Sequence, residues 1–468
     1  MIDLWESKEA EDATGGRSTC DWVASGVSID TRTLKYGDMF VALKDVRDGH
    51  DFVADAFSKG AAVAVVSHVP KGLPKKAPLL IVDDVQSALE SLGVASRRRS
   101  NAQIIAVTGS VGKTSTKEML LITLAQQGRT HAAVASYNNH WGVPLTLARM
   151  PKDTQFGIFE IGMNRPGEIT PLTQQVRPHV ALITNVSEAH LEAFDSVGGI
   201  AFEKASIMEG LEDEGCAILN GDISTTEILK NVADVIGCKQ IWFGNSSGNA
   251  KLISCERQEE KIHIHALING FPLYFTLSTL GQHFALNALA AIAAIQALGG
   301  NLTKAAADLV LWTPGSGRGA RKELNTSLGK IELIDDAYNA NPASMIAALE
   351  MLAATKAKRR IAILGDMREL GSEADTFHAA LSEHSAIKKL DKLHTVGTHM
   401  GALHKKLSQS QRGVHFAKAQ DLLLHLEHLI QKDDCILVKA SLGTGLKVIS
   451  KAILALDYAP QQTARKEA

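Results

Sequence analysis

The feature that most constrains the fold is a glycine-rich turn between an apolar run and an amphipathic segment, in IIAVTGSVGKTSTKEMLLITLAQQG. The apolar run predicts a buried strand, and the segment after the turn predicts a helix. In such a turn, backbone N–H groups face a phosphate and the helix N-terminus adds partial positive charge. Lys113 can then reach the β and γ oxygens of a nucleotide, while the Thr114 hydroxyl holds Mg²⁺. The residues predicted to bind the phosphates are Thr108, Gly109, Ser110, Val111, Gly112, Lys113, Thr114 and Ser115.

The turn departs from the strict spacing of a phosphate-binding loop, GxxxxGK[ST], because Val107 stands where the first glycine is expected. The competing interpretation is a plain strand-to-helix turn with a surface lysine. The strand before the turn and the helix after it favour phosphate binding. A phosphate loop serves kinases, switches and motors as well as ligases, so the reaction has to be inferred from other residues.

Composition excludes several classes of protein. At about 150 residues per domain, the 468 residues suggest about three domains. Lys and Arg number 49 against 51 Asp and Glu, so no general positive field attracts nucleic acid or an anionic membrane. The five cysteines form no CxxC pair, which argues against a disulfide framework and a zinc cluster. This pattern is typical of a reducing compartment, and we expect the protein in the cytoplasm.

Two segments bear on targeting and membranes. The acidic N-terminus, MIDLWESKEAEDATGG, lacks the basic and apolar regions of a secretory signal. Residues 262–303 contain no Asp, Glu, Lys or Arg, but their longest strictly apolar run covers only 288–295. That run is far shorter than the roughly 20 residues needed to cross a bilayer, so no membrane span is predicted. The segment is interpreted instead as the closing strands and a helix of the domain that carries the glycine-rich turn.

Apolar runs that end at polar or glycine-rich turns, each followed by a helical segment, predict an α/β protein with three domains. A central parallel sheet with helices on both faces, built around the phosphate loop, is predicted for residues 101–313. An α/β domain over residues 1–100 precedes it, and a Rossmann-like domain over residues 314–468 follows. Arg97, Arg98 and Arg99 are interpreted as a solvated linker, and the polar tail 461–468 as a frayed end. The runs predicted as strands are GDMFVAL, AAVAVVS, QIIAVTGS, FGIFEIG, VALITNV, GCAILNGD, LIDDAYN, IAILGDM and CILVKAS.

Chemically useful residues follow several of these runs, where ligands collect in parallel sheets. Glu160 ends FGIFEIG and could hold Mg²⁺, although an exposed strand-end acid is the simpler alternative. His190 follows VALITNV, and its spacing leaves a metal ligand and a structural histidine equally open. Lys204, in GIAFEKASIMEGL, is typical of a solvated helix lysine when its sequence is taken by itself.

Further candidates lie in the second half of the chain. His283 and Asn287 are four residues apart on a predicted helix and share one face, and an asparagine amide suits an adenine edge. Polar residues on an Ala-rich packing helix are an equally weighted alternative. Arg318, in PGSGRGARKEL, suits phosphate oxygens. Asp336, in LIDDAYNANP, can accept from a ribose hydroxyl or serve as a plain turn aspartate.

The motifs TGSVGKTS, NNHWGVPLTL, EIGMNRPGEI, ITNVSEAHL and IDDAYNANPASM, together with the helix that carries Asn287, occur in this order. In this combination the chain resembles the Mur ligase family of ATP-dependent amide-forming enzymes over roughly residues 27–450. SIDTRTLKYGDMFVALKDVRDGHDF and LGDMRELG resemble the member that adds D-alanyl-D-alanine to UDP-N-acetylmuramoyl-tripeptide in peptidoglycan precursor synthesis.

The resemblance implies ATP and Mg²⁺ as cofactors. Thr114 and Glu160 would hold one Mg²⁺ and His190 a second. Lys204 would be carbamylated by carbon dioxide, which turns a cation into an oxygen ligand for a metal that prefers oxygen. With Lys113, the residues Glu160, His190 and Lys204 form the catalytic set.

The resemblance also implies the binding residues. Asn287 would contact adenine, Arg318 the phosphates and Asp336 the ribose. The residues implied to bind the UDP-linked substrate are Asp30, Thr31, Arg32, Asp48, Gly49, His50, Asn138 and Asn139. The chain departs from the family pattern at Asp45, and at Ala440 and Leu442 in LVKASLGTG, so Leu442 is given no substrate role.

The partners implied are UDP-N-acetylmuramoyl-tripeptide and D-alanyl-D-alanine, with no nucleic acid, and the chain is expected to be a monomer. Two alternatives are weighed against this interpretation. One is the family member that adds the third amino acid, which LGDMRELG and the absence of a DNPR-type motif disfavour. The other is a P-loop switch or binding module, whose guanine-selecting NKxD motif is absent.

Overall fold

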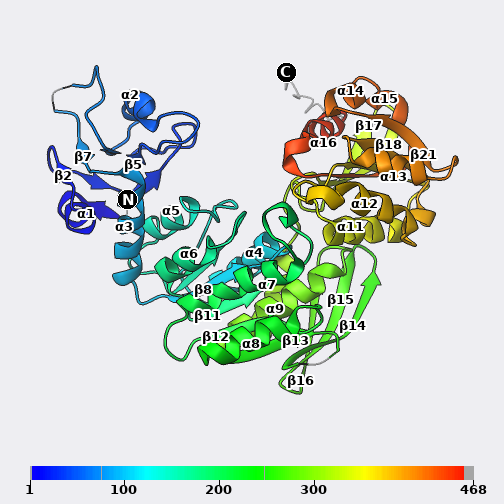
Figure 1. Cartoon of the computed structure of the whole chain (residues 1–468), viewed down its shortest axis with the longest axis horizontal. Coiled ribbons are helices and arrows are strands. Elements are labelled where there is room, and N and C mark those ends of the chain that lie inside the picture. Colours follow the sequence, from blue (N-terminus) through cyan, green and yellow to red (C-terminus); the bar gives the residue numbers. More distant parts are fainter. Residues whose placement is uncertain (1–2, 75, 247, 458–468) are drawn as a thin grey trace, which may run out of the picture.

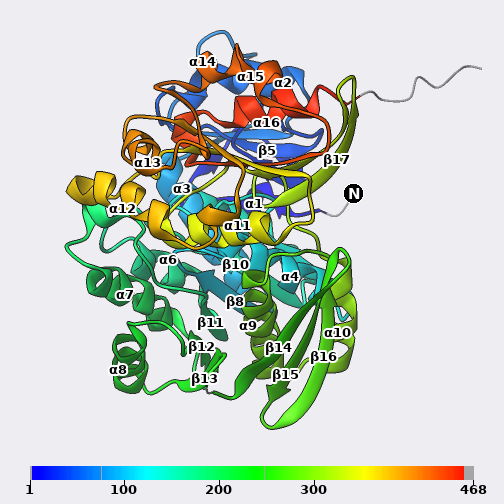
Figure 2. The same cartoon turned by 90° about the vertical axis from the view of Figure 1, so that its right-hand side faces the viewer.

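The computed structural model describes residues 3–74, 76–246 and 248–457. Within them, three large sheets follow one another along the chain, and each defines one unit of the fold. Figure 1 shows the first and third units standing apart on the same side of the central unit. In the view turned by 90° they overlap above it (Figure 2). The tail 461–468, predicted to be frayed, lies outside the described residues.

The first unit is a five-stranded sheet in the order β2-β7-β6-β5-β4, parallel except at β2. The strands predicted over 37–43 and 61–67 are confirmed as β5 and β6. Alternate residues of β5 face opposite sides of the sheet. Met39 packs with helices α1 and α3 on one side, and Phe40 packs with α2 on the other. The elements are β1 (Trp5–Glu6), α1 (Ser7–Thr14), β2 (Arg17–Ser18), β3 (Val23–Ala24), β4 (Gly26–Ser28), β5 (Asp38–Val41), 3₁₀ helix η1 (Gly49–Phe52), α2 (Val53–Ser58), β6 (Val63–Val66), β7 (Leu79–Ile81) and α3 (Val85–Arg98).

The prediction of a solvated linker at the three arginines is wrong. Arg97 lies within α3 and is only 5% exposed. Its guanidinium donates to the carbonyl oxygens of Val176 and Arg177, at 2.8 and 2.9 Å, and pairs with Glu212 at 3.2 Å. These acceptors belong to the central unit, so Arg97 joins two units. Sequence reasoning missed this role because the acceptors in the central unit are remote in the chain.

The central unit is a nine-stranded sheet in the order β16-β15-β14-β13-β12-β11-β8-β10-β9. Its strands from β8 to β14 are parallel, as predicted. They are β8 (Gln103–Thr108), β9 (Thr130–Ala132), β10 (Phe156–Glu160), β11 (Val180–Ile183), β12 (Cys216–Asn220), β13 (Lys239–Gly244), β14 (Ala250–Gln258), β15 (Lys261–Ile268) and β16 (Phe271–Leu277).

Helices cover both faces of this sheet, which confirms the prediction. Ile105 and Val107 of β8 pack with α4 and α9, whereas Ile104 and Ala106 pack with helices on the opposite face. The helices are α4 (Lys113–Ala125), α5 (Gly142–Ala148), α6 (Ile169–Val176), η2 (Leu191–Ala193), α7 (Val197–Ala205), η3 (Ser206–Gly210), α8 (Thr226–Ile236), α9 (His283–Ala297), α10 (Leu302–Asp308) and η4 (Leu309–Leu311).

The charge-free segment 262–303 forms most of β15, then β16 and α9. The strands and the helix interpreted in this segment are therefore confirmed, whereas the antiparallel pairing of β14, β15 and β16, which extends the sheet, was not predicted. In β15 the buried residues alternate with more exposed ones, which is the pattern of a strand with one face on the core. Among the described residues, no helix combines the length and the apolar character needed to cross a membrane.

The third unit is a six-stranded sheet in the order β17-β18-β22-β19-β20-β21, parallel except for the β17–β18 hairpin. The runs predicted as strands, LIDDAYN, IAILGDM and CILVKAS, contain the last residues of β18, β19 and β22. The elements are β17 (Ala320–Thr326), β18 (Gly329–Asp336), α11 (Pro342–Ala354), β19 (Arg359–Gly365), η5 (Gly371–Glu373), α12 (Ala374–Ala380), η6 (Leu381–Glu383), η7 (Ile387–Lys389), β20 (Lys392–Val396), α13 (Met400–Lys406), β21 (Arg412–Phe416), α14 (Ala419–Leu423), α15 (Leu426–Leu429), β22 (Asp434–Lys439), η8 (Leu442–Thr444) and α16 (Lys447–Leu454).

Candidate active site

The glycine-rich turn joins β8 to α4 as predicted. Gly109 and Gly112 adopt φ values of 149° and 86°, which side-chain-bearing residues rarely reach. A Cβ on Gly109 would meet the Thr184 hydroxyl at 2.0 Å, so only glycine fits there. Lys113 folds back over the turn, and its Nζ donates to the Gly109 carbonyl at 2.5 Å. Burial lowers the pKa of Lys113. The turn is therefore a compact loop with the Lys113 side chain already folded into it.

The other residues of the turn are fixed by the segment after β11. Ser110 donates its hydroxyl proton to the Ser187 carbonyl at 3.1 Å and accepts from the Ser187 N–H at 3.0 Å. Thr184 donates to the Val111 carbonyl at 2.5 Å. Thr108 closes β8, and Ser115 is buried in the first turn of α4. Val107, at the position of the missing glycine, is a paired residue of β8 and lies outside the turn.

A carboxylate faces the threonine of the loop. The Thr114 hydroxyl donates to Glu160 Oε2 at 2.8 Å, and the Asn138 amide donates to Glu160 Oε1 at 2.8 Å. Glu160 closes β10 and is only 2% exposed, so it is not a solvent-facing strand-end acid. Two oxygen donors thus lie together beside the loop, which is the ligand type that Mg²⁺ prefers.

Ser136, which the sequence analysis missed, links the threonine beside this carboxylate to Arg318, and Lys117, also missed, holds Ser136 in place. The Arg318 guanidinium donates to the Ser136 hydroxyl at 2.8 Å, and that hydroxyl lies 3.4 Å from the Thr114 hydroxyl. Lys117, 2% exposed, donates to the carbonyl oxygens of Ala133 and Ala135 and so holds the segment that carries Ser136. Burial lowers the pKa of Lys117. No signal in the sequence indicated these contacts. Lys117 is one of several Ser, Thr and Lys residues in TGSVGKTSTKEM, and Ser136 lies outside that motif.

Arg318 also lies over the ring of Tyr338, with its guanidinium carbon 4.3 Å from the ring centroid. It stands in the connection between η4 of the central unit and β17 of the third. This position lets one cation contact both units beside the phosphate loop.

Lys204 is buried, contrary to what its sequence alone indicates. It lies in α7, is 1% exposed, and no carboxylate of the described residues pairs with it. Burial, followed by the nearby charge of Lys113, lowers the pKa of Lys204 well below its usual value. A lowered pKa favours the neutral amine, and only the neutral amine has the free electron pair that reacts with carbon dioxide.

His190 meets a carboxylate from the third unit. It follows β11, and its Nδ1 lies 2.5 Å from Oε2 of Glu369, which follows β19 in LGDMRELG. Both residues have a left-handed backbone with φ of 65°. The pKa of Glu369 is lowered by this contact with His190. Glu369 was not among the predicted site residues, because it lies far from His190 in sequence.

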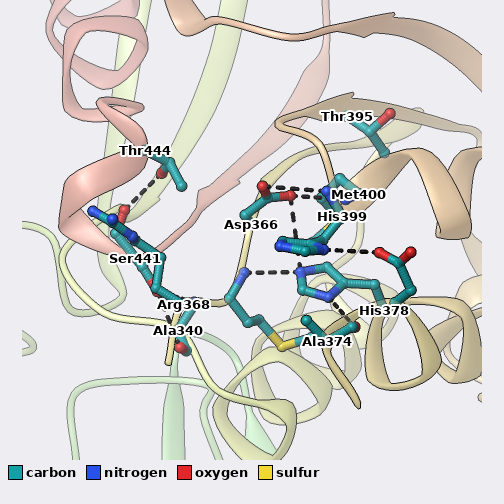
Figure 3. A network of polar contacts seen from close by, with 12 residues as sticks. Ala340, Asp366, Arg368, Ala374, His378, Thr395, His399, Met400, Ser441 and Thr444 are labelled. Atoms are coloured by element: carbon teal, nitrogen blue, oxygen red, sulfur yellow. Dashed lines mark hydrogen bonds and ion pairs between the residues drawn. The ribbon is translucent and has the colours of Figure 1, made fainter. Parts of the chain in front are cut away.

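The backbone around Glu369 is held by a polar network at the carboxyl end of the third sheet (Figure 3). The Met367 N–H donates to His378 Nε2 at 2.9 Å, and the Arg368 N–H donates to the Ser441 hydroxyl at 3.0 Å. Asp366 accepts from the N–H groups of His399 and Met400, at 3.3 and 2.7 Å. The loop that presents Glu369 is therefore fixed from three directions.

The residues predicted to hold the base and the ribose lie on different elements. Asn287 projects from α9 against Gly112, where a Cβ would meet its Oδ1 at 2.6 Å, so it lies at the phosphate loop. Asp336 closes β18 and pairs with Lys439 of β22 at 2.7 Å. Lys439 is only 1% exposed, and it also donates to the Asn339 carbonyl at 3.0 Å.

The residues predicted to bind the UDP-linked substrate form two clusters in the first unit and one in the central unit. Arg32 pairs with Asp30 at 2.6 Å, beside the buried Thr31. Asp48 accepts hydrogen bonds from the backbone N–H and the Nδ1 of His50. The Nε2 of His50 accepts from the Ser67 N–H. Gly49 lies so close to the Ala42 backbone that a side chain would not fit. In the central unit, Asn139 Oδ1 accepts from the Gly142 N–H at the start of α5.

A strand, a glycine-rich turn with a lysine, and a carboxylate beside the following threonine define a P-loop protein with a nucleotide-type site. Residues 107–295 match the Mur ligase middle domain, and residues 320–442 match the Mur ligase, glutamate ligase domain. The chain belongs to the Mur ligase family.

Similarity to individual relatives extends over nearly the whole chain. The chain is 34% identical to the UDP-N-acetylmuramoyl-tripeptide--D-alanyl-D-alanine ligase of Rickettsia prowazekii (strain Madrid E), over 95% of this chain and 99% of that protein. It is also 34% identical to the ligase of the same name from Escherichia coli (strain K12), over 97% of this chain and 99% of that protein. A crystal structure of MurF from Acinetobacter baumannii superimposes with a TM-score of 0.82 at 28% identity, covering 97% and 100% of the two chains.

Proposed function

We propose that this chain is an ATP-dependent ligase that joins D-alanyl-D-alanine to UDP-N-acetylmuramoyl-tripeptide, giving the pentapeptide precursor of peptidoglycan, ADP and phosphate. The observation that carries the proposal is the similarity to ligases of that name, which covers all three units. The contact between Thr114 and Glu160 beside a phosphate loop supports it independently, because that arrangement suits a magnesium nucleotide.

In this proposal each of the three units binds a different substrate. Residues 1–100 bind the UDP-linked substrate through Asp30, Thr31, Arg32, Asp48, Gly49 and His50. Residues 101–313 bind ATP, with Asn138 and Asn139 toward the tripeptide. Residues 314–468 close over the nucleotide and bind the dipeptide. The chain acts as a monomer in the cytoplasm, where its five free cysteines stay reduced.

The residues present fit magnesium. Thr114 and Glu160 supply oxygen donors for one ion, and His190 with a carbamate on Lys204 supplies a second. Among the described residues no three His, Cys, Asp or Glu side chains gather as a metal cluster, and nucleotide oxygens and water would supply the remaining ligands of each ion. The unpaired, buried Lys204 suits the carbamate, since that modification gives it a role that its surroundings otherwise lack. When bound, magnesium would neutralise phosphate charge.

The reaction follows from the need to activate a carboxylate. The terminal carboxylate of the tripeptide attacks the γ-phosphorus of ATP, and the bond to the β-γ bridging oxygen breaks, giving an acyl phosphate and ADP. The neutral amine of D-alanyl-D-alanine then attacks the acyl carbon, and the tetrahedral intermediate expels phosphate as the amine loses its proton. Lys113 and Arg318 stabilise the charge that develops on the transferred group, the largest kind of contribution in phosphoryl transfer.

One assay tests the proposal. Phosphate release is measured with ATP and UDP-N-acetylmuramoyl-tripeptide, in parallel with D-alanyl-D-alanine, with a diamino acid and with no acceptor. We expect release only with the dipeptide. Dependence on the diamino acid would identify the ligase for the third residue, and release that ignores the acceptor would identify a P-loop switch.

A further inference from the structure

The further inference concerns the contact between two loops from different units. The His190 loop (residues 188–193) follows β11, and the Glu369 loop (residues 366–371) follows β19. Besides the short contact between His190 and Glu369, the Glu192 N–H donates to the Glu369 carbonyl at 3.2 Å. The loops therefore meet through a side-chain contact and a backbone hydrogen bond at one point.

Both residues of this contact have an unfavourable backbone conformation. His190 and Glu369 are non-glycine residues with left-handed φ, a conformation retained only where the surroundings impose it. On the Glu369 side, the network of Figure 3 imposes it, since it fixes the N–H groups of Met367 and Arg368 just before Glu369. The carboxylate is thus presented to His190 by a prearranged loop.

The two nitrogens of His190 have different surroundings. Nδ1 is buried and lies 2.5 Å from Glu369 Oε2, a close ion-pair contact whose angle is outside hydrogen-bond geometry, and no other residue of the described chain accepts a hydrogen bond from it. Nδ1 therefore faces a carboxylate, and Nε2 is the nitrogen left to bind a metal. A carboxylate on one ring nitrogen of a histidine fixes the tautomer, orients the ring and raises the basicity of the other nitrogen.

We propose that Glu369 is a positioning residue that orients His190 for metal binding, so that the third unit completes a metal site in the central unit. This rests on the proposed function only for the presence of a metal at His190. The metal site is then sensitive to the contact between units, because withdrawal of the Glu369 loop leaves His190 without its orienting carboxylate.

The test measures Mn²⁺ binding to the full chain in the presence of ADP. Glu369→Gln keeps the shape of the side chain and removes its charge. We expect Mn²⁺ affinity at the His190 site to fall about 10- to 100-fold, with the site at Thr114 and Glu160 unchanged. The electron spin echo of bound Mn²⁺ should show weaker modulation from the histidine nitrogen.

Two variants serve as controls. Glu192→Gln changes an exposed carboxylate of the His190 loop and leaves the backbone N–H that donates to Glu369 in place, and we expect it to bind Mn²⁺ like the unmodified protein. In a His190→Ala background, Glu369→Gln should cause no further loss, because both changes remove the same site. Glu369→Asp moves the carboxylate back by one methylene, and it is expected to weaken Mn²⁺ binding too, so it tests the proposal even where the Gln variant does not fold.

Unchanged Mn²⁺ affinity and nitrogen modulation in Glu369→Gln would overturn the proposal, as would losses that add to those of His190→Ala. Such a result would not change the outcome of the ligase assay with the unmodified protein, so the proposed function would still stand. Conversely, an unmodified protein that binds Mn²⁺ through His190 but forms no pentapeptide would overturn only the proposed function.

Discussion

The carboxamide of Asn287 lies against Gly112, so close that a Cβ on this glycine would stand 2.6 Å from Oδ1 and 3.1 Å from Nδ2. Gly112 also has φ of 86° at the N-terminus of α4. Helix α9 therefore sets the space available to the phosphate loop. A residue on a helix remote in sequence thus adds to the requirement for glycine at position 112.

Gly112→Ala should weaken ATP binding at least about tenfold while the chain still folds. The added methyl group meets Asn287, and alanine in a left-handed backbone adds roughly 1–2 kcal/mol of strain. A fluorescent ATP analogue measures the affinity. Gly237→Ala is the matched control, because Gly237 has φ of 75° with nothing within 4 Å of the added Cβ. Equal ATP affinity in both variants would contradict the role given to Asn287.

Lys113→Ala should lower kcat about a hundredfold or more and leave the binding of UDP-N-acetylmuramoyl-tripeptide nearly unchanged. The ammonium lies inside the phosphate loop, where removal of a charge-stabilising donor typically lowers kcat by about 10²–10³. Steady-state phosphate release and calorimetric binding of the UDP substrate give the two values. Lys230→Ala, on the exposed side of α8, should change neither. Comparable losses in turnover and in UDP-substrate binding would contradict the proposed division between the units.

Arg97→Ala should lower the free energy of unfolding by about 2–4 kcal/mol, because it removes three charge-assisted contacts and leaves buried carbonyl oxygens unpaired. Urea unfolding measures the change. Arg98→Ala is the control from the same helix turn, since Arg98 is exposed, and we expect it within about 0.5 kcal/mol of the unmodified protein. Similar effects at both positions would show that the join between the units does not depend on Arg97.

His394 should make stability depend on pH. It is 4% exposed in β20, its Nδ1 accepts from the Val414 N–H at 3.1 Å, and burial lowers its pKa to about 4. In the unfolded chain a histidine titrates near about 6.5. Between these values the unfolded state binds the proton and the folded state does not. The stabilisation is therefore complete above about pH 6.5 and decreases as the pH falls toward 4.

His394→Asn keeps an acceptor near the position of Nδ1 and cannot titrate in this range. Urea unfolding at pH 7.5 and pH 5 should show a smaller loss of stability on acidification than in the unmodified protein. His428→Asn, at an exposed position of the same unit, should leave the loss as it was. An unchanged difference in His394→Asn would mean that this histidine is protonated in the folded protein.

The sequence predicted the parallel strands and the phosphate loop because both are local patterns. A run such as QIIAVTGS carries its own burial signal, and the glycines of the turn are needed by its own backbone. Strands were also interpreted in the charge-free segment, where KIHIHALI alternates between apolar and polar residues. The antiparallel pairing of β14, β15 and β16 was not predicted, because the direction of pairing is not a property of any single run.

The contacts of the candidate site could be predicted only in part. Glu160 ends an apolar run, a position that marks strand ends in any parallel sheet. Ser136 and Glu369 have no such mark. Lys439 ends the run CILVK, but its pairing with Asp336 comes from another strand, so all three residues gain their roles from partners that the fold brings from elsewhere. Lys204 shows the same limit, since its sequence is that of a surface lysine and its burial comes from packing among several elements.

The position of β22, the last strand of the third sheet in chain order, affects how this sheet forms during synthesis of the chain. β22 pairs with β18 on one side and β19 on the other, so it occupies the middle of its sheet although it is made last. Until residues 434–439 leave the ribosome, both neighbours have open edges, and a chain truncated before them has two separate half-sheets. Exposed edges of this kind attract other strands and proteases. Because β22 fills the position between β18 and β19, a chain that lacks β22 cannot form the complete six-stranded sheet.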